Sequence, residues 1–294
     1  MTNRRGIECR NRCNRAARQE PQHATRRPES GSRPCVDKTT LAAVRRAALQ
    51  ILVALVVINT SATVAMVGGA SPASPTVARR LALIVGSRGN FCTGVALARD
   101  LVLTVAHCVV PGADYKVVEY NGGHQPLLRD VAQIARHPQF DLKALLTHRA
   151  TADVALLKLR RPADLDPAFL ANSQRAVAAG DRFLVAGYGV AVRGDGRTGG
   201  SARAAILIAT GQPNSLQMRL IDRDALATGG LGACTGDSGA PVFAVAESLA
   251  VIGLVSWSTG PGETAGCGGL TGVTPLTRYR GWILEQAARL GSQL

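Results

Sequence analysis

The chain has 294 residues, a length that allows one large hydrophobic core or two smaller ones. Its net charge is +14, yet residues 1–46 hold 12 of its 34 Lys and Arg residues and only 4 of its 20 Asp and Glu residues. No basic stretch is interleaved with aromatic residues, which make up 4% of the chain. We therefore expect a solvated basic surface and no nucleic-acid partner.

Residues 1–35 are polar and Arg-rich without apolar periodicity, so we expect a disordered leader. We also hypothesise that translation begins near Val36, which would leave this leader unmade. Residues 36–65 resemble a signal peptide, with a basic segment at 38–46, an apolar segment at 47–58 and a small-residue tail. A membrane anchor is the alternative, because residues 47–70 carry no charge over about the length that spans a bilayer. A signal peptide would give a secreted or periplasmic protein. A membrane anchor would instead leave residues 66–294 outside the cytoplasm and attached to the membrane only through the retained leader.

Residues 66–294 predict a β-rich body. Short apolar runs alternate with turn residues there, as is typical of a sandwich or barrel. The predicted strands are residues 81–85, 94–98, 101–106, 117–120, 154–159, 183–186, 204–209, 242–244 and 249–255. No helical periodicity precedes residues 279–290, where Trp282, Ile283 and Ala287 share one helical face.

Three polar residues stand out against the apolar runs of this body. His107 lies in Ala-His-Cys at 106–108, Asp153 begins the apolar segment that ends at residue 159, and Ser238 lies in Gly-Asp-Ser-Gly-Ala-Pro at 236–241. A serine hydroxyl is a weak nucleophile at neutral pH unless a histidine takes its proton and a carboxylate orients that histidine. His107, Asp153 and Ser238 are the candidates for these catalytic roles.

In this order and with these flanks, the three motifs resemble those of the chymotrypsin/trypsin-type serine proteases, and a secreted, bacterial-looking member is expected. The resemblance covers residues 66–294. It implies two antiparallel six-stranded β-barrels with a C-terminal helix and a boundary at about residues 160–182. His107 and Asp153 would then come from the first barrel and Ser238 from the second. The implied activity is that of a monomeric serine endopeptidase that cleaves polypeptides through an acyl-enzyme, with no metal or cofactor.

The resemblance also assigns residues to the oxyanion hole and the specificity pocket. The backbone amides of Gly236 and Ser238 would bind the oxyanion. Gly232 occupies the position at the base of the pocket, and its lack of a carboxylate implies an uncharged rather than a Lys or Arg side chain at the cleavage site. The implied pocket walls are Ser256, Trp257, Ser258 and Gly272.

Four of the seven cysteines lie in the body, an even number that suits an oxidising compartment. Four cysteines allow three connectivities, of which the resemblance selects Cys92–Cys108 and Cys234–Cys267. Zinc binding is the alternative, but the body has no Cys-x-x-Cys pair.

Met66-Val-Gly-Gly69 resembles the start of mature members of the family. In those enzymes the freed amine pairs with the Asp beside the nucleophile, which is Asp237 here. Signal cleavage after Ala65 would free Met66, whereas cleavage after Ala70 would not.

Two other functions remain open, a catalytically silent protease-like binding or regulatory protein and a membrane-tethered protease. Such silent proteins typically lack a member of the triad. The presence of all three residues and Gly236 therefore favours an enzyme.

Overall fold

The computed structural model describes residues 66–120, 125–172, 176–211, 216–224, 230–245 and 248–294. All described residues belong to one compact unit. The predicted leader and the predicted signal or anchor at 36–65 lie outside the described residues. None of the helices within the described ranges is both long and apolar enough to cross a membrane.

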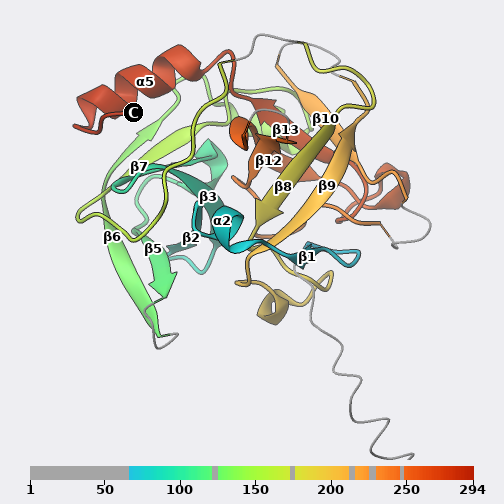
Figure 1. Cartoon of the computed structure of the whole chain (residues 1–294), viewed down its shortest axis with the longest axis horizontal. Coiled ribbons are helices and arrows are strands. Elements are labelled where there is room, and N and C mark those ends of the chain that lie inside the picture. The colour runs from blue at the N-terminus through green and yellow to red at the C-terminus, as the bar shows by residue number, and fades with distance from the viewer. Residues whose placement is uncertain (1–65, 121–124, 173–175, 212–215, 225–229, 246–247) are drawn as a thin grey trace, which may run out of the picture. The chain divides into compact units, whose positions relative to one another are not determined.

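The first half of this unit is a closed antiparallel β-barrel with strand order β2-β3-β4-β7-β6-β5 (Figure 1). Its strands are β2 (Leu81–Gly86), β3 (Phe91–Ala98), β4 (Leu101–Thr104), β5 (Tyr115–Tyr120), β6 (Pro126–Arg136) and β7 (Ala155–Leu159). Along β5, buried side chains alternate with more exposed ones, because successive residues of a strand point to opposite faces. The interior is filled by aliphatic side chains such as Val95, Leu103 and Leu156, each 0% exposed.

The second half is also a closed six-stranded barrel. Its strands are β8 (Arg182–Gly187), β9 (Arg203–Ala209), β10 (Met218–Ile221), β11 (Pro241–Ala244), β12 (Ala250–Ser258) and β13 (Thr271–Pro275). They follow the order β9-β10-β13-β12-β11-β8, and pairing of β8 with β9 closes the ring. The short β1 (Ser71–Pro72) pairs with β9 as an additional strand.

The C-terminal helix α5 (Arg280–Arg289) packs against the core of the first barrel, although it follows the last strand of the second (Figure 1). Ile283 and Ala287 are 0% and 1% exposed, and Trp282 packs against the same core. The helix thereby connects the two halves. Two six-stranded antiparallel barrels and a C-terminal helix confirm the predicted fold class.

Besides the two-residue β1, three barrel strands lie outside the predicted set. β6 is largely exposed, and its Arg129, Asp130 and Gln133 interrupt any apolar run. β10 has only four residues, and β13 contains Gly272 and Pro275, which sequence patterns associate with turns. These strands form because neighbouring strands offer hydrogen-bond partners, and the local residue pattern does not show which partners will be available.

Two short helices add to the expected elements, and one predicted strand extends too far at its C-terminal end. The short helices α2 (Pro75–Ala78) and α3 (Leu142–Leu146) precede residue 279, and neither is long enough to show a helical period. Residues 105–106 were predicted to extend a strand, but β4 ends at Thr104 and the 3-10 turn η1 (Ala106–Cys108) follows.

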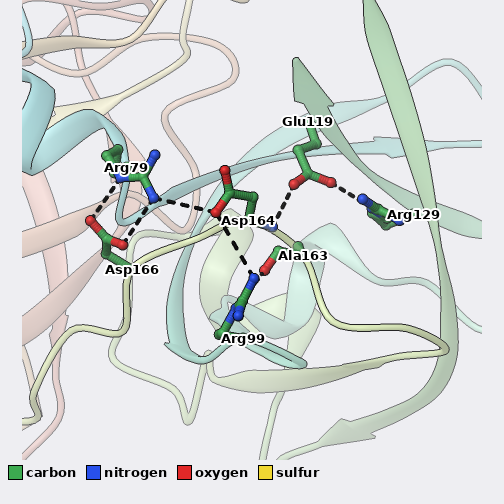
Figure 2. A network of polar contacts seen from close by, with 7 residues as sticks. All are labelled: Arg79, Arg99, Glu119, Arg129, Ala163, Asp164 and Asp166. Carbon is green, nitrogen blue, oxygen red and sulfur yellow. Dashed lines mark hydrogen bonds and ion pairs between the residues drawn. The ribbon is translucent and has the colours of Figure 1, made fainter. Parts of the chain in front are cut away.

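A network of charged groups joins the segment after β7 to the first barrel (Figure 2). Asp164 Oδ1 accepts a hydrogen bond from Arg79 Nη2 at 3.3 Å and lies 3.9 Å from Arg99 Nη2. The buried Glu119 of β5 accepts hydrogen bonds from Arg129 Nε and from the Asp164 amide. The pairs of Asp164 are exposed, and exposed ion pairs contribute only about 0–1 kcal/mol each, whereas the buried Glu119 carboxylate needs its two donors to replace water.

Candidate active site

Strand pairing in the first barrel brings His107 and Asp153 together. β4 ends just before η1, which carries His107, and Asp153 lies just before β7, which pairs with β4 in the register Thr104↔Ala155. His107 Nδ1 lies 2.7 Å from Asp153 Oδ2, and the His107 amide donates to Asp153 Oδ1 at 3.0 Å. A carboxylate only accepts, so Nδ1 carries the proton and Nε2 is left as the basic nitrogen.

Asp153 is held from both barrels. It is 0% exposed, and Ser256 Oγ, from β12 of the second barrel, donates to its Oδ2 at 2.6 Å. Three hydrogen bonds therefore compensate the buried carboxylate for the water it has lost. The side chain of Ser256, predicted as a pocket wall, instead supports the acid.

Ser238 and His107 line one cavity of about 380 Å³. Within the described residues, no hydrogen bond joins the Ser238 hydroxyl to His107. Catalytic hydrogen bonds are often long in unliganded sites and tighten when substrate binds, so the shared cavity is the relevant observation.

The structure also describes the two backbone amides that were expected to bind the oxyanion. The Val190 amide donates to Thr235 O at 2.8 Å. Because the C=O and N–H of a trans peptide point in opposite directions, this bond directs the Gly236 N–H away from Val190. In the described part of the chain, neither the Gly236 nor the Ser238 amide has an acceptor, and both residues line the cavity.

Only glycine fits at position 236. Its φ is +93°, a conformation that side chains rarely adopt, and an added Cβ would lie 2.0 Å from Phe91 Cε2. The neighbouring Phe91 of β3 also lines the cavity.

The residues assigned to the specificity pocket divide into two groups. Trp257 and Ser258 line the cavity, but Gly232 and Gly272 do not. A Cβ at Gly272 would lie 2.0 Å from Trp257 Cε2, so the indole packs directly on this glycine. Gly232 is paired with Val67, whose carbonyl accepts its amide at 3.2 Å.

Two residues that sequence patterns did not identify contact residues that line the cavity. His148 stacks on Trp257 with ring centroids 4.5 Å apart and an interplanar angle of 9°. Arg193 Nη2 donates to Cys267 O at the cavity wall, and none of the lining residues is acidic. A single His or Arg in a polar loop carries no sequence signal for such a position.

Both expected disulfides are present. Cys92–Cys108 ties β3 to η1, and Cys234–Cys267 ties the loop of Ser238 to the segment before β13. All four cysteines line the cavity. The crosslinks therefore restrict the backbone on both sides of the candidate nucleophile.

Asp237, next to Ser238, is a second fully buried carboxylate. Burial raises its pKa to about 7, although hydrogen bonds from the Cys234 amide at 3.0 Å and the Gly189 amide at 2.8 Å oppose the increase. No cation pairs with it among the described residues. A Cβ at Gly189 would fall 2.3 Å from its carboxyl group, so glycine provides the space it occupies.

Comparisons with known proteins agree on one family. The family model described as Trypsin matches residues 66–283. The chain is 28% identical to a vitellin-degrading protease of Bombyx mori, over 68% of this chain and 77% of that protein. It is also 28% identical to human kallikrein-14, over 75% and 83%. A solved structure of human heparin binding protein has a TM-score of 0.57 and 25% identity, covering 73% and 94%. These relatives are animal proteins, so the expectation of a bacterial-looking member is not supported.

We predict that Asp237 makes the uncleaved chain less stable as pH rises. Its unfolded pKa is near 3.8 and its folded pKa about 7, so the folded state binds the extra proton between these values. The free energy of unfolding should therefore fall across pH 4–7, by up to about 4 kcal/mol, relative to Asp237→Asn. Urea denaturation at a series of pH values measures this difference.

The control is Asp130→Asn. Lys116 lowers the pKa of this exposed carboxyl, so its contribution has the opposite sign and should be small. Parallel pH profiles for Asp237→Asn and the unmodified chain would contradict the prediction.

Proposed function

Because the chain belongs to the trypsin family of serine endopeptidases, we propose that it hydrolyses peptide bonds with His107, Asp153 and Ser238. The observation that carries this proposal is the His107–Asp153 bond of 2.7 Å beside the cavity that Ser238 shares. The buried carboxylate fixes the tautomer in which His107 Nε2 can act as a base.

In the proposed reaction, Ser238 Oγ attacks the carbonyl carbon while His107 Nε2 takes its proton. Negative charge develops on the carbonyl oxygen, where the Gly236 and Ser238 amides donate hydrogen bonds. His107 then gives the proton to the leaving amine, which leaves an acyl-enzyme on Ser238. Water, activated in the same way, hydrolyses the acyl-enzyme, and Asp153 stabilises the imidazolium in both steps.

We propose a preference for uncharged side chains at the cleavage site. Among the described residues, none that lines the cavity is acidic, and Gly232 supplies no carboxylate. The Arg193 guanidinium, which donates to the carbonyl of the cavity-lining Cys267, disfavours a second cation nearby.

We further propose that a free Met66 amine activates the enzyme by pairing with Asp237. Met66 is 0% exposed and belongs to the same apolar cluster as Ala233 and Ala240, which flank the nucleophile loop. Val67 pairs with Gly232 in that region. An ammonium group would supply the cation that buried Asp237 lacks among the described residues.

An exported enzyme fits these features. Two disulfides suit an oxidising, extracellular compartment. We propose secretion or periplasmic export with removal of the leader, and a retained leader would instead give a membrane-tethered protease.

A catalytically silent binding protein is the second candidate. It is favoured by the likeness to heparin binding protein, whose name records binding rather than proteolysis. The His107–Asp153–Ser256 arrangement argues against it, because a binding protein has no use for a buried carboxylate that orients a histidine.

Labelling with a fluorophosphonate tests the proposed enzyme. We expect stoichiometric labelling of the mature protein, none in Ser238→Ala, and labelling at least about 10³-fold slower in Asp153→Asn because the wrong tautomer of His107 is held. Mass spectrometry locates the adduct. A folded, mature protein that does not react would favour the binding protein.

A pair of variants at the pocket base tests the substrate preference. In a peptide-library profile of the mature protein, we expect cleavage after uncharged residues to exceed cleavage after Lys or Arg. Gly232→Asp should raise relative cleavage after Lys and Arg at least about tenfold over Gly232→Asn, since the two side chains differ in charge but hardly in size. Equal profiles for the two variants would refute the assignment of Gly232.

The position of the amine tests activation. A protein that starts at Met66 should be about 10- to 100-fold more active than one that starts at Ala65, because the extra residue moves the ammonium away from Asp237. Activity of the Met66 form should also fall at alkaline pH, when an amine whose pKa is raised by a carboxylate finally deprotonates. N-terminal sequencing of the secreted protein is decisive, and a natural start at Ser71 would contradict the proposal.

A further inference from the structure

Thr93 is a buried hydroxyl that the proposed reaction does not use directly. It lies on β3 of the first barrel, immediately after Cys92, and is 0% exposed. Its neighbours along the strand are mostly apolar or glycine. A polar side chain buried at such a position needs partners, and these show what it holds.

The hydroxyl of Thr93 joins two loops of the second barrel. Thr93 Oγ1 donates to Gly236 O at 2.8 Å and accepts from the Tyr188 amide at 3.0 Å. Its single proton and one of its lone pairs are therefore used. The Thr93 amide also donates to Ser238 O at 2.9 Å, so the residue contacts the nucleophile loop at two carbonyls.

Gly236 needs such support because its own backbone is permissive. Glycine has no Cβ, so its φ and ψ are not restricted by local sterics. The peptide before Gly236 is fixed by the bond from Val190 to Thr235 O. The peptide after it is held at both ends: Thr93 binds the Gly236 carbonyl, and the Asp237 amide donates to Cys234 O at 2.9 Å.

We infer that Thr93 is a positioning residue for the oxyanion hole: its hydroxyl, on the first barrel, fixes the peptide between Gly236 and Asp237 on the second. Without it, this peptide keeps only the bond from the Asp237 amide to Cys234 O at 2.9 Å, so ψ of Gly236 is less restrained and the Gly236 and Ser238 amides converge less well on one point. This inference rests on the proposed hydrolysis through Ser238. The first barrel, which carries His107, would then also position the oxyanion hole of the second barrel.

Substitution of Thr93 separates positioning from packing. Thr93→Val keeps the branched shape and removes the hydroxyl, while Thr93→Ser keeps the hydroxyl. Thr104→Val is the matched control, because Thr104 is equally buried and donates to Thr93 O at 2.8 Å without bonding the nucleophile loop. Thermal melting of all three variants reports any general loss of stability.

For 4-nitrophenyl acetate, we expect Thr93→Val to lower kcat about 10- to 100-fold with KM within about threefold, since a misplaced donor acts on the transition state. An oxyanion develops both when the acyl-enzyme forms and when it is hydrolysed. The value of kcat therefore depends on the oxyanion hole whichever of the two steps is rate-limiting. Thr93→Ser should restore kcat to within about threefold. Thr104→Val should lower the melting temperature but leave kcat within about threefold.

Amide hydrogen exchange over residues 234–239 gives a readout that needs no turnover. We expect exchange at least about tenfold faster in Thr93→Val and little changed in Thr104→Val. Unchanged exchange in Thr93→Val would overturn the inference, as would faster exchange with unchanged kcat or an equal loss of kcat in Thr104→Val. An unmodified protein that does not react with fluorophosphonate would overturn both the proposed function and this inference. If the unmodified protein reacts, a negative result with the Thr93 variants overturns only the inference about Thr93.

Discussion

The candidate site depends on one buried carboxylate, Asp153, at the junction of the two barrels. A fully buried carboxylate is costly unless donors replace its water, and here the donors come from both sides. The first barrel supplies the amide and ring of His107, and the second supplies the hydroxyl of Ser256. The need to satisfy this group therefore sets the register of the barrels around the cavity, and separation of the barrels would leave the carboxylate short of a partner.

Hydrogen bonds cross this junction in both directions. Ser256, on the second barrel, orients the acid of the first. In the opposite direction, Thr93 on the first barrel binds the Gly236 and Ser238 carbonyls of the second. The C-terminal helix adds an apolar contact, because it leaves the second barrel and packs on the core of the first. We infer that the base and the oxyanion hole are held in register by reciprocal hydrogen bonds rather than by either barrel alone.

The sequence predicted what is local and missed what depends on pairing. His107, Asp153 and Ser238 lie in short motifs, and the family resemblance carried the fold class and both disulfides. The strands β6 and β13 were missed because partner strands, rather than an apolar period, stabilise them. The packing of Trp257 on Gly272 depends on the pairing of β12 with β13, and its stacking with His148 depends on where the segment after α3 lies, so no spacing in the chain could have shown them.

The two buried carboxylates of the site differ in how their charge is balanced. Asp153 accepts three hydrogen bonds, two of them from His107, a group that can itself become a cation during the reaction. Asp237 accepts only two backbone amides, and burial raises its pKa to about 7. The described chain thus completes the base but leaves the residue beside the nucleophile without a counter-charge. Because Asp237 lies between Gly236 and Ser238, we expect any cation that reaches it to act on the proposed oxyanion hole and on the proposed nucleophile together.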